Sequence, residues 1–125
     1  MNIKDKKMKR TNVNTSNREK EFDIVELHSS FCSIFVSPVR LRISWMLDNG
    51  EKSVGEIAKK LKLSLPNVSQ HLRIMRDLGA VCTKKSGRTV YYSNANPKFL
   101  KGSKLIQEGL IEELKKRGSS RTYKP

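Results

Sequence analysis

Residues 61–81 read LKLSLPNVSQHLRIMRDLGAV and predict a helix with one apolar and one polar face. Ser64 is a suitable N-cap, Pro66 fits the first turn, and Gly79 ends the run. The apolar positions recur at mostly helical spacing: Leu65, Val68, Leu72, Ile74, Met75 and Leu78. The polar side chains can all hydrogen-bond bases or phosphates: Ser64, Asn67, Ser69, Gln70, Arg73 and Arg76. We therefore predict a DNA-recognition helix.

A second short helix is predicted immediately before this one. Ser53 and Glu56 stand three residues apart in the arrangement of a capping box, and the apolar pattern then continues to Leu61. Lys62 and Leu63 make the connection to the recognition helix short. Two short helices joined tightly, the second carrying polar side chains, predict a helix-turn-helix.

A basic hairpin is predicted after the recognition helix. Residues 80–85 and 88–93 alternate as two strands around a tight turn at Ser86 and Gly87. Lys84, Lys85 and Arg88 cluster at its tip. Such a hairpin is typical of a wing that contacts the DNA backbone or minor groove, and the alternative is an exposed turn that is basic by chance.

Three further helices are predicted outside this unit, over residues 21–36, from Ser37 and Pro38 to the Asn49-Gly50 pair, and over residues 97–117. The first and last carry wide apolar stripes: Ile24, Leu27, Phe31 and Ile34, flanked by His28, Cys32 and Phe35, on one, and Phe99, Ser103, Ile106, Leu110 and Leu114 on the other. A domain of this size does not bury both stripes alone. We expect a mainly α fold with a small β-hairpin, a winged helix-turn-helix, that dimerises through its first and last helices.

Composition favours a polyanionic partner. The 125 residues carry a formal net charge of +14 and a pI near 10.1, and two cysteines indicate a reducing compartment. No apolar run is long enough for a membrane span, and no signal peptide is evident, so we expect a cytoplasmic protein. The expected organisation is a disordered basic arm over residues 1–20, the DNA-binding and dimerisation domain over 21–117, and a basic tail over 118–125.

Four segments resemble the ArsR/SmtB family of winged-helix transcriptional repressors: residues 37–43 (SPVRLRI), 53–61, 66–79 and 87–92. The most specific parts are VSQHLR and the LGAV that follows it. The resemblance implies a homodimer on a pseudo-palindromic operator, released by a metal ion, metalloid, or reactive sulfur or redox species. It implies that Asn67, Ser69, Gln70 and Arg73 enter the major groove and that Arg88 serves the wing. For His71 we favour a structural hydrogen bond over a metal-ligand role.

The positions that sense inducers in such relatives differ in this chain. Ser53 and Gly55 stand where arsenic-sensing members carry a Cys-x-Cys, no histidine follows His71, and the second and last helices lack cysteines. The usual metal sites are therefore not expected, and the inducer is not assigned. His28 and Cys32 share a helical face but form only two metal ligands, and Cys32 with Cys82 is a candidate redox pair.

The function predicted from the sequence is sequence-specific regulation of transcription. We expect a homodimeric repressor that binds double-stranded DNA, needs no cofactor and is not an enzyme, because no catalytic constellation or phosphate-binding loop is present. The alternative is a basic architectural protein that coats DNA without sequence preference. Polar amides and hydroxyls on one helix face argue against that alternative, since phosphate binding alone favours Lys and Arg.

Overall fold

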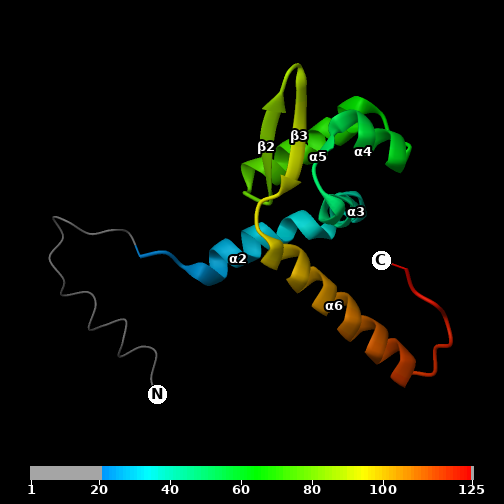
Figure 1. Ribbon diagram of the computed structural model, residues 1–125. Helices are drawn as coiled ribbons and strands as arrows, with labels where there is room; N and C mark the ends of the chain where they lie inside the picture. The colour runs from blue at the N-terminus through cyan, green and yellow to red at the C-terminus, as the bar shows by residue number, and fades with distance from the viewer. Residues whose placement is uncertain (1–20, 125) are drawn as a thin grey trace, which may run out of the picture.

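The computed structural model describes residues 21–124, and the arm predicted over residues 1–20 lies outside that range. Figure 1 shows the arrangement, with its element labels used below: the wing rises at the top, α4 and α5 lie beside it, and below the wing α2 extends to the left and α6 to the lower right. The elements in order are α2 (Ile24–Cys32), η2 (Ser33–Val36), α3 (Pro38–Met46), η3 (Leu47–Asn49), β1 (Lys52–Ser53), α4 (Val54–Leu61), α5 (Leu65–Asp77), β2 (Val81–Ser86), β3 (Thr89–Asn94) and α6 (Pro97–Lys116). The predicted mainly helical winged helix-turn-helix is confirmed.

The first predicted helix is shorter than expected and ends in a 3-10 turn. The carboxylate of Asp23 accepts hydrogen bonds from the amides of Val25 and Glu26, so the helix begins at Ile24 and not at residue 21. Ser37 is extended because a proline follows it, and this ends the helical run. The side chain of Ser37 then caps α3 at the amide of Arg40.

The helix-turn-helix follows from local capping. Ser53 and Glu56 form the predicted capping box, with both side-chain hydrogen bonds at 3.2 Å. Lys62 adopts a left-handed conformation at φ 56° and turns the chain toward α5. The hydroxyl of Ser64 accepts from the amide of Asn67 at 3.3 Å. These three features fix where α4 ends and α5 begins.

The wing is a three-stranded antiparallel sheet in the order β1-β3-β2. Ser86 pairs with Thr89, so the two-residue turn consists of Gly87 and Arg88 and not, as predicted, Ser86 and Gly87. Gly87 has φ +61°, which a type II′ turn requires at its first central residue. Strand β1 was not predicted, because a two-residue strand has no periodicity of its own and exists only by pairing with β3.

The core lies between α3, α4, α5 and the base of the wing. It is formed by ten buried side chains: Ile34, Ile43, Leu47, Ile57, Ala58, Val68, Leu72, Met75, Ala80 and Val81. The amide of Asn94 donates to the carbonyl oxygen of Ser44 at 2.9 Å and ties the end of β3 to α3. Within residues 21–124, no helix has the length and apolar character needed to cross a membrane.

Candidate nucleic-acid interface

The outward face of α5 carries the predicted DNA-reading side chains. Val68, Leu72 and Met75 point into the core and are fully buried. Successive helical residues turn by about 100°, so Gln70 and Arg73 lie at the centre of the opposite face. The members of the predicted set on α5 or at its cap are all exposed: Ser64, Asn67, Ser69, Gln70, Arg73 and Arg76. These polar side chains are therefore accessible to an external partner, and their role in DNA binding stays a prediction.

The helical geometry separates members of the predicted set. Ser69 and Arg76 lie along one edge of the exposed face, and Asn67 lies along the other. Ser64 has a structural role as well, because its hydroxyl oxygen caps the helix. Two predicted apolar positions were wrong in orientation, since Leu65 is 54% exposed and Leu78 is 41% exposed.

His71 connects α5 to α3. Nε of Arg40 donates to Nδ1 of His71 at 3.3 Å, so the predicted structural hydrogen bond is present. Because Nδ1 accepts, the neutral ring carries its proton on Nε2. Burial, and then the positive charge of Arg40, lower the pKa of His71 below its ordinary value of 6.5. The sequence analysis did not single out Arg40, whose role depends on a contact 31 residues away along the chain.

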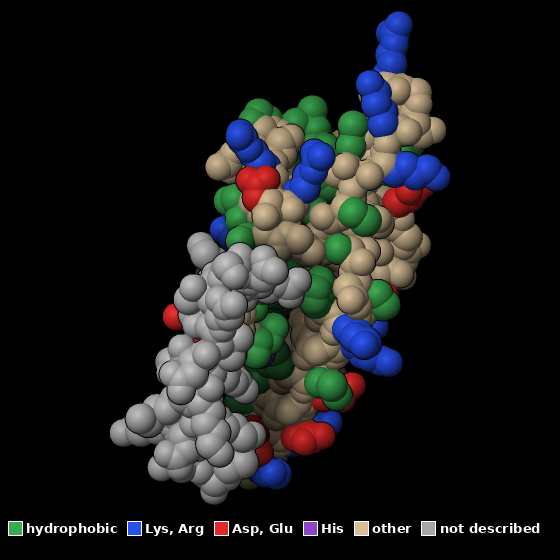
Figure 2. All heavy atoms as spheres, turned by 90° about the vertical axis from the view of Figure 1, so that its left-hand side faces the viewer, with side chains coloured by type: hydrophobic (Ala, Val, Ile, Leu, Met, Phe, Trp, Pro, Cys, Tyr) green, Lys and Arg blue, Asp and Glu red, His purple; other side chains and the backbone are tan. Residues whose placement is uncertain are grey.

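The three wing cations are exposed but face different directions. Lys84 pairs with Tyr91 and Lys85 with Val90, and neighbouring positions of a strand point to opposite faces. Arg88 occupies the turn itself. Figure 2 shows Lys and Arg side chains at the top of the molecule, where the wing ends. The predicted cluster therefore reaches both sides of the hairpin and its tip.

The cations of this surface have no acidic partner in the described part of the chain. The ion pairs found within residues 21–124 join Lys104 to Asp48 and Lys116 to Glu113, and none of these four residues belongs to α5 or to the β2–β3 hairpin. Five cations remain available to an external anion: Arg73, Arg76, Lys84, Lys85 and Arg88. Exposed, unpaired cations beside amides and hydroxyls suit contacts to phosphates and bases.

The candidate metal and redox residues lie on α2, for His28 and Cys32, and on strand β2 of the wing, for Cys82. In residues 21–124, no group of three or more His, Cys, Asp or Glu side chains is arranged to hold a metal ion, so His28 and Cys32 gain no third ligand. Cys32 and Cys82 are both free and exposed; the latter lies 3.2 Å from the Ser93 hydroxyl on the wing. Ser53, which the sequence analysis aligned with one cysteine of the Cys-x-Cys of arsenic-sensing relatives, caps α4 in this chain.

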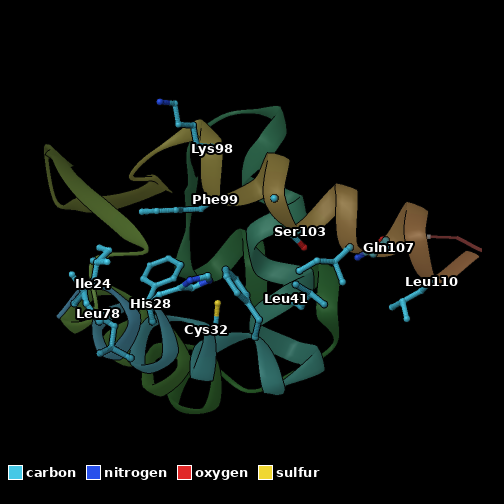
Figure 3. Close-up of a pocket in the computed structure, with 16 residues that line it drawn as sticks. Ile24, His28, Cys32, Leu41, Leu78, Lys98, Phe99, Ser103, Gln107 and Leu110 are labelled. Atoms are coloured by element: carbon cyan, nitrogen blue, oxygen red, sulfur yellow. The ribbon is translucent and has the colours of Figure 1, made fainter. Parts of the chain in front are cut away.

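A second surface, the α2–α6 groove, lies between the first and last helices. It has a volume of about 800 Å³, and Figure 3 shows Ile24, His28 and Cys32 facing Phe99, Ser103 and Leu110 across it. Phe31 of α2 and Phe99 of α6 both line it, with their ring centroids 4.3 Å apart. Ile24 is 68% exposed, Ile106 65% and Leu110 59%. The groove is thus an apolar surface that the chain does not cover with its own described residues.

The geometry defines a winged helix-turn-helix protein. Residues 37–82 match the family model described as "Bacterial regulatory protein, arsR family". The nodulation protein NolR of Rhizobium meliloti is 37% identical over 76 residues, covering 61% of this chain and 62% of NolR. The transcriptional activator HlyU of Vibrio cholerae is 46% identical over 54 residues, covering 43% of this chain and 50% of HlyU. The matched parts thus span 50–62% of these curated relatives.

Solved structures agree with these matches. HlyU from Vibrio cholerae superimposes with a TM-score of 0.64 at 30% identity, covering 70% of this chain and 96% of that one. A Mycobacterium bovis domain, described as a homodimeric winged helix-turn-helix DNA-binding domain, superimposes with a TM-score of 0.70 at 20% identity, covering 88% and 100%. The chain belongs to the arsR family of bacterial regulatory proteins. The family is one of regulators, not enzymes, in agreement with the sequence analysis.

Proposed function

We propose that this chain is a sequence-specific DNA-binding transcriptional regulator, a repressor, that binds a pseudo-palindromic operator as a homodimer. The single observation that supports it most is the exposed polar face of α5, with Gln70 and Arg73 at its centre and the buried Leu72 behind it. Gln forms bidentate hydrogen bonds with adenine, and Arg forms them with guanine. The first turn is held by its cap, so the face is preorganised for base contacts.

The wing supplies the second part of the proposed interface. Lys84, Lys85 and Arg88 are exposed without acidic partners in residues 21–124, and they flank a hairpin next to the end of α5. Cations at this place bind phosphates and position the recognition helix without reading sequence. The predicted association therefore combines base readout by α5 with phosphate binding by the wing.

The proposed homodimer rests on the α2–α6 groove. None of the nine residues of α2 is buried, although Ile24, Val25 and Leu27 are apolar. A second copy that packs its own α2 and α6 against this face would cover it around a two-fold axis. The Mycobacterium bovis domain of the same fold is described as homodimeric, which is consistent with self-association here. Two recognition helices related in this way should prefer half-sites about 10 bp apart.

The decisive experiment separates base readout from phosphate binding. Operators are selected from random DNA, and Gln70→Ala, Lys85→Ala and the wild type are then titrated on the selected operator and on random DNA. Gln70→Ala should lose about tenfold in affinity on the operator and much less on random DNA, because it removes a base contact. Lys85→Ala should weaken both about equally and lower the slope of log affinity against log salt by about 1. Lys115→Ala, at the exposed end of α6, is the matched control.

The alternative function, non-specific coating of DNA, gives a different result. A flat profile in the selection, with equal losses for Gln70→Ala and Lys85→Ala, would favour an architectural protein. The repressor direction is tested with a promoter reporter carrying the selected operator, since HlyU is named an activator. Adding zinc, arsenite, a thiol oxidant or persulfide to the operator complex tests the inducer class, including the proposed redox pair Cys32 and Cys82.

A further inference from the structure

Leu65 is an exposed apolar side chain at the start of the DNA-reading helix. It is the first residue of α5 and is 54% exposed. Leu63, two residues earlier, packs against the core, whereas Leu65 does not join the core cluster or line the α2–α6 groove. Its exposure therefore has no explanation in the packing of residues 21–124.

Leu65 lies in the first turn of α5, at the boundary between the core-facing side and the exposed polar face that carries the proposed base-reading side chains. It lies one helical turn before Ser69 on the same edge of α5. Helical side chains lean toward the N-terminus, so the Leu65 side chain extends past the first turn of the helix. The first turn of a recognition helix is the part that reaches base edges in the major groove.

The chemistry of the major groove offers few partners for such a side chain. Bases present hydrogen-bond donors and acceptors there, and the only methyl group among the four standard bases is the 5-methyl of thymine. An isobutyl side chain makes no hydrogen bond, but it gains free energy when it buries a methyl group away from water. Leu65 therefore complements thymine and not the polar edges of the other bases.

We infer that Leu65 determines operator specificity by packing against the 5-methyl group of one thymine in each half-site. This inference rests on the proposed function, because it requires α5 to lie in the major groove. It adds a reader that is absent from the polar set and that acts through apolar contact. Specificity at this position then depends on a methyl group and not on hydrogen-bond pairing.

The test removes one methyl group at a time. Each thymine of the selected operator is replaced in turn by deoxyuridine, which keeps Watson–Crick pairing and lacks the 5-methyl group. Wild-type binding should fall about fourfold at one position of each half-site, the effect expected for one buried methyl group. Leu65→Ala should bind the thymine operator more weakly and be insensitive to deoxyuridine at that position. Leu65→Met, which keeps an apolar side chain, should retain the sensitivity.

A matched control and two opposite outcomes keep the inference separable from the proposed function. Leu105→Ala truncates a leucine that is 64% exposed on α6 and should keep the full deoxyuridine effect. A specific operator with no sensitive thymine, or with the same sensitivity in Leu65→Ala, overturns the inference and leaves the proposed function standing. A flat selection from random DNA overturns both. Circular dichroism of each variant checks that a loss of binding does not come from unfolding.

Discussion

The recognition helix α5 and the first helix α2 are both amphipathic, but they use their apolar faces differently. α5 buries Val68, Leu72 and Met75 within its own chain, while α2 buries no residue at all. The polar face of α5 is exposed, and Ser64 caps the N-terminus of this helix. The exposed face of α2, in contrast, includes Ile24 and Leu27. Within residues 21–124, the chain therefore buries the apolar side of α5, whereas it leaves the apolar surface of the α2–α6 groove uncovered.

The largest expected effect on stability comes from a substitution on the buried side of α5. Leu72→Ala removes a fully buried side chain and should lower the free energy of unfolding by about 3 kcal/mol, because it leaves a cavity in the core. Urea denaturation followed by circular dichroism measures this change. Gln70→Ala, two residues away on the exposed face, should change it by no more than about 0.5 kcal/mol. Similar losses in the free energy of unfolding for both variants would contradict the division of α5 into one buried and one exposed face.

A smaller effect is expected from a substitution in the α2–α6 groove. Ile106→Glu introduces a charge into the apolar surface of α6 and should weaken self-association by about 2 kcal/mol, roughly thirtyfold in the dissociation constant, since burying an unpaired carboxylate is costly. Sedimentation equilibrium measures the association, and Glu108→Gln on the exposed side of α6 is the control. An unchanged dissociation constant would contradict dimerisation through α6.

The smallest effect concerns the contact that holds α5 against α3, Arg40 with His71. The pKa of His71 is lowered in the folded state, so the unfolded chain binds the extra proton first. Stability is therefore fully present above about pH 6.5 and falls as the pH drops below it. His71→Asn keeps an acceptor for Arg40 without titrating, so its urea midpoint should vary less between pH 7 and 5. Because His71 is only partly buried, the difference is small, and a midpoint that rises on acidification would contradict the assignment.

Periodicity and capping predicted most of the fold because these signals are local. The Ser53–Glu56 box, the Ser64 cap and the Gly79 stop set helix boundaries through neighbours within a few residues. Strand β1 was missed because its only stabilising partner, β3, lies about 40 residues further along the chain. The turn of the wing was placed one residue too early because pairing register, and not turn composition, fixes it.

The sequence predicted that the polar side chains of α5 are exposed, but not how all of its apolar residues are oriented. Exposed polar residues on α5 were expected, yet helical periodicity alone misplaced Leu65, which lies at the boundary between the buried and exposed faces. The partner of His71 could not be predicted, since Arg40 approaches it only after α3 and α5 pack together. Long-range contacts of this kind leave no spacing signal in the sequence.

The pairing of β1 with β3 has a mechanical consequence. Lys52 and Ser53 pair with Tyr92 and Tyr91 directly before α4 begins, so the hairpin is tied to the helix-turn-helix at this point of β3. Six-residue strands extend about 20 Å, which makes the hairpin a stiff arm with Arg88 at its end. A rotation of about 10° at its base moves the tip by about 3.5 Å, close to the rise of one base pair in DNA. In the proposed homodimer, a small rotation of one protomer relative to its partner would therefore move the wing away from the phosphates that it is proposed to contact, while the contacts within the helix-turn-helix stay intact.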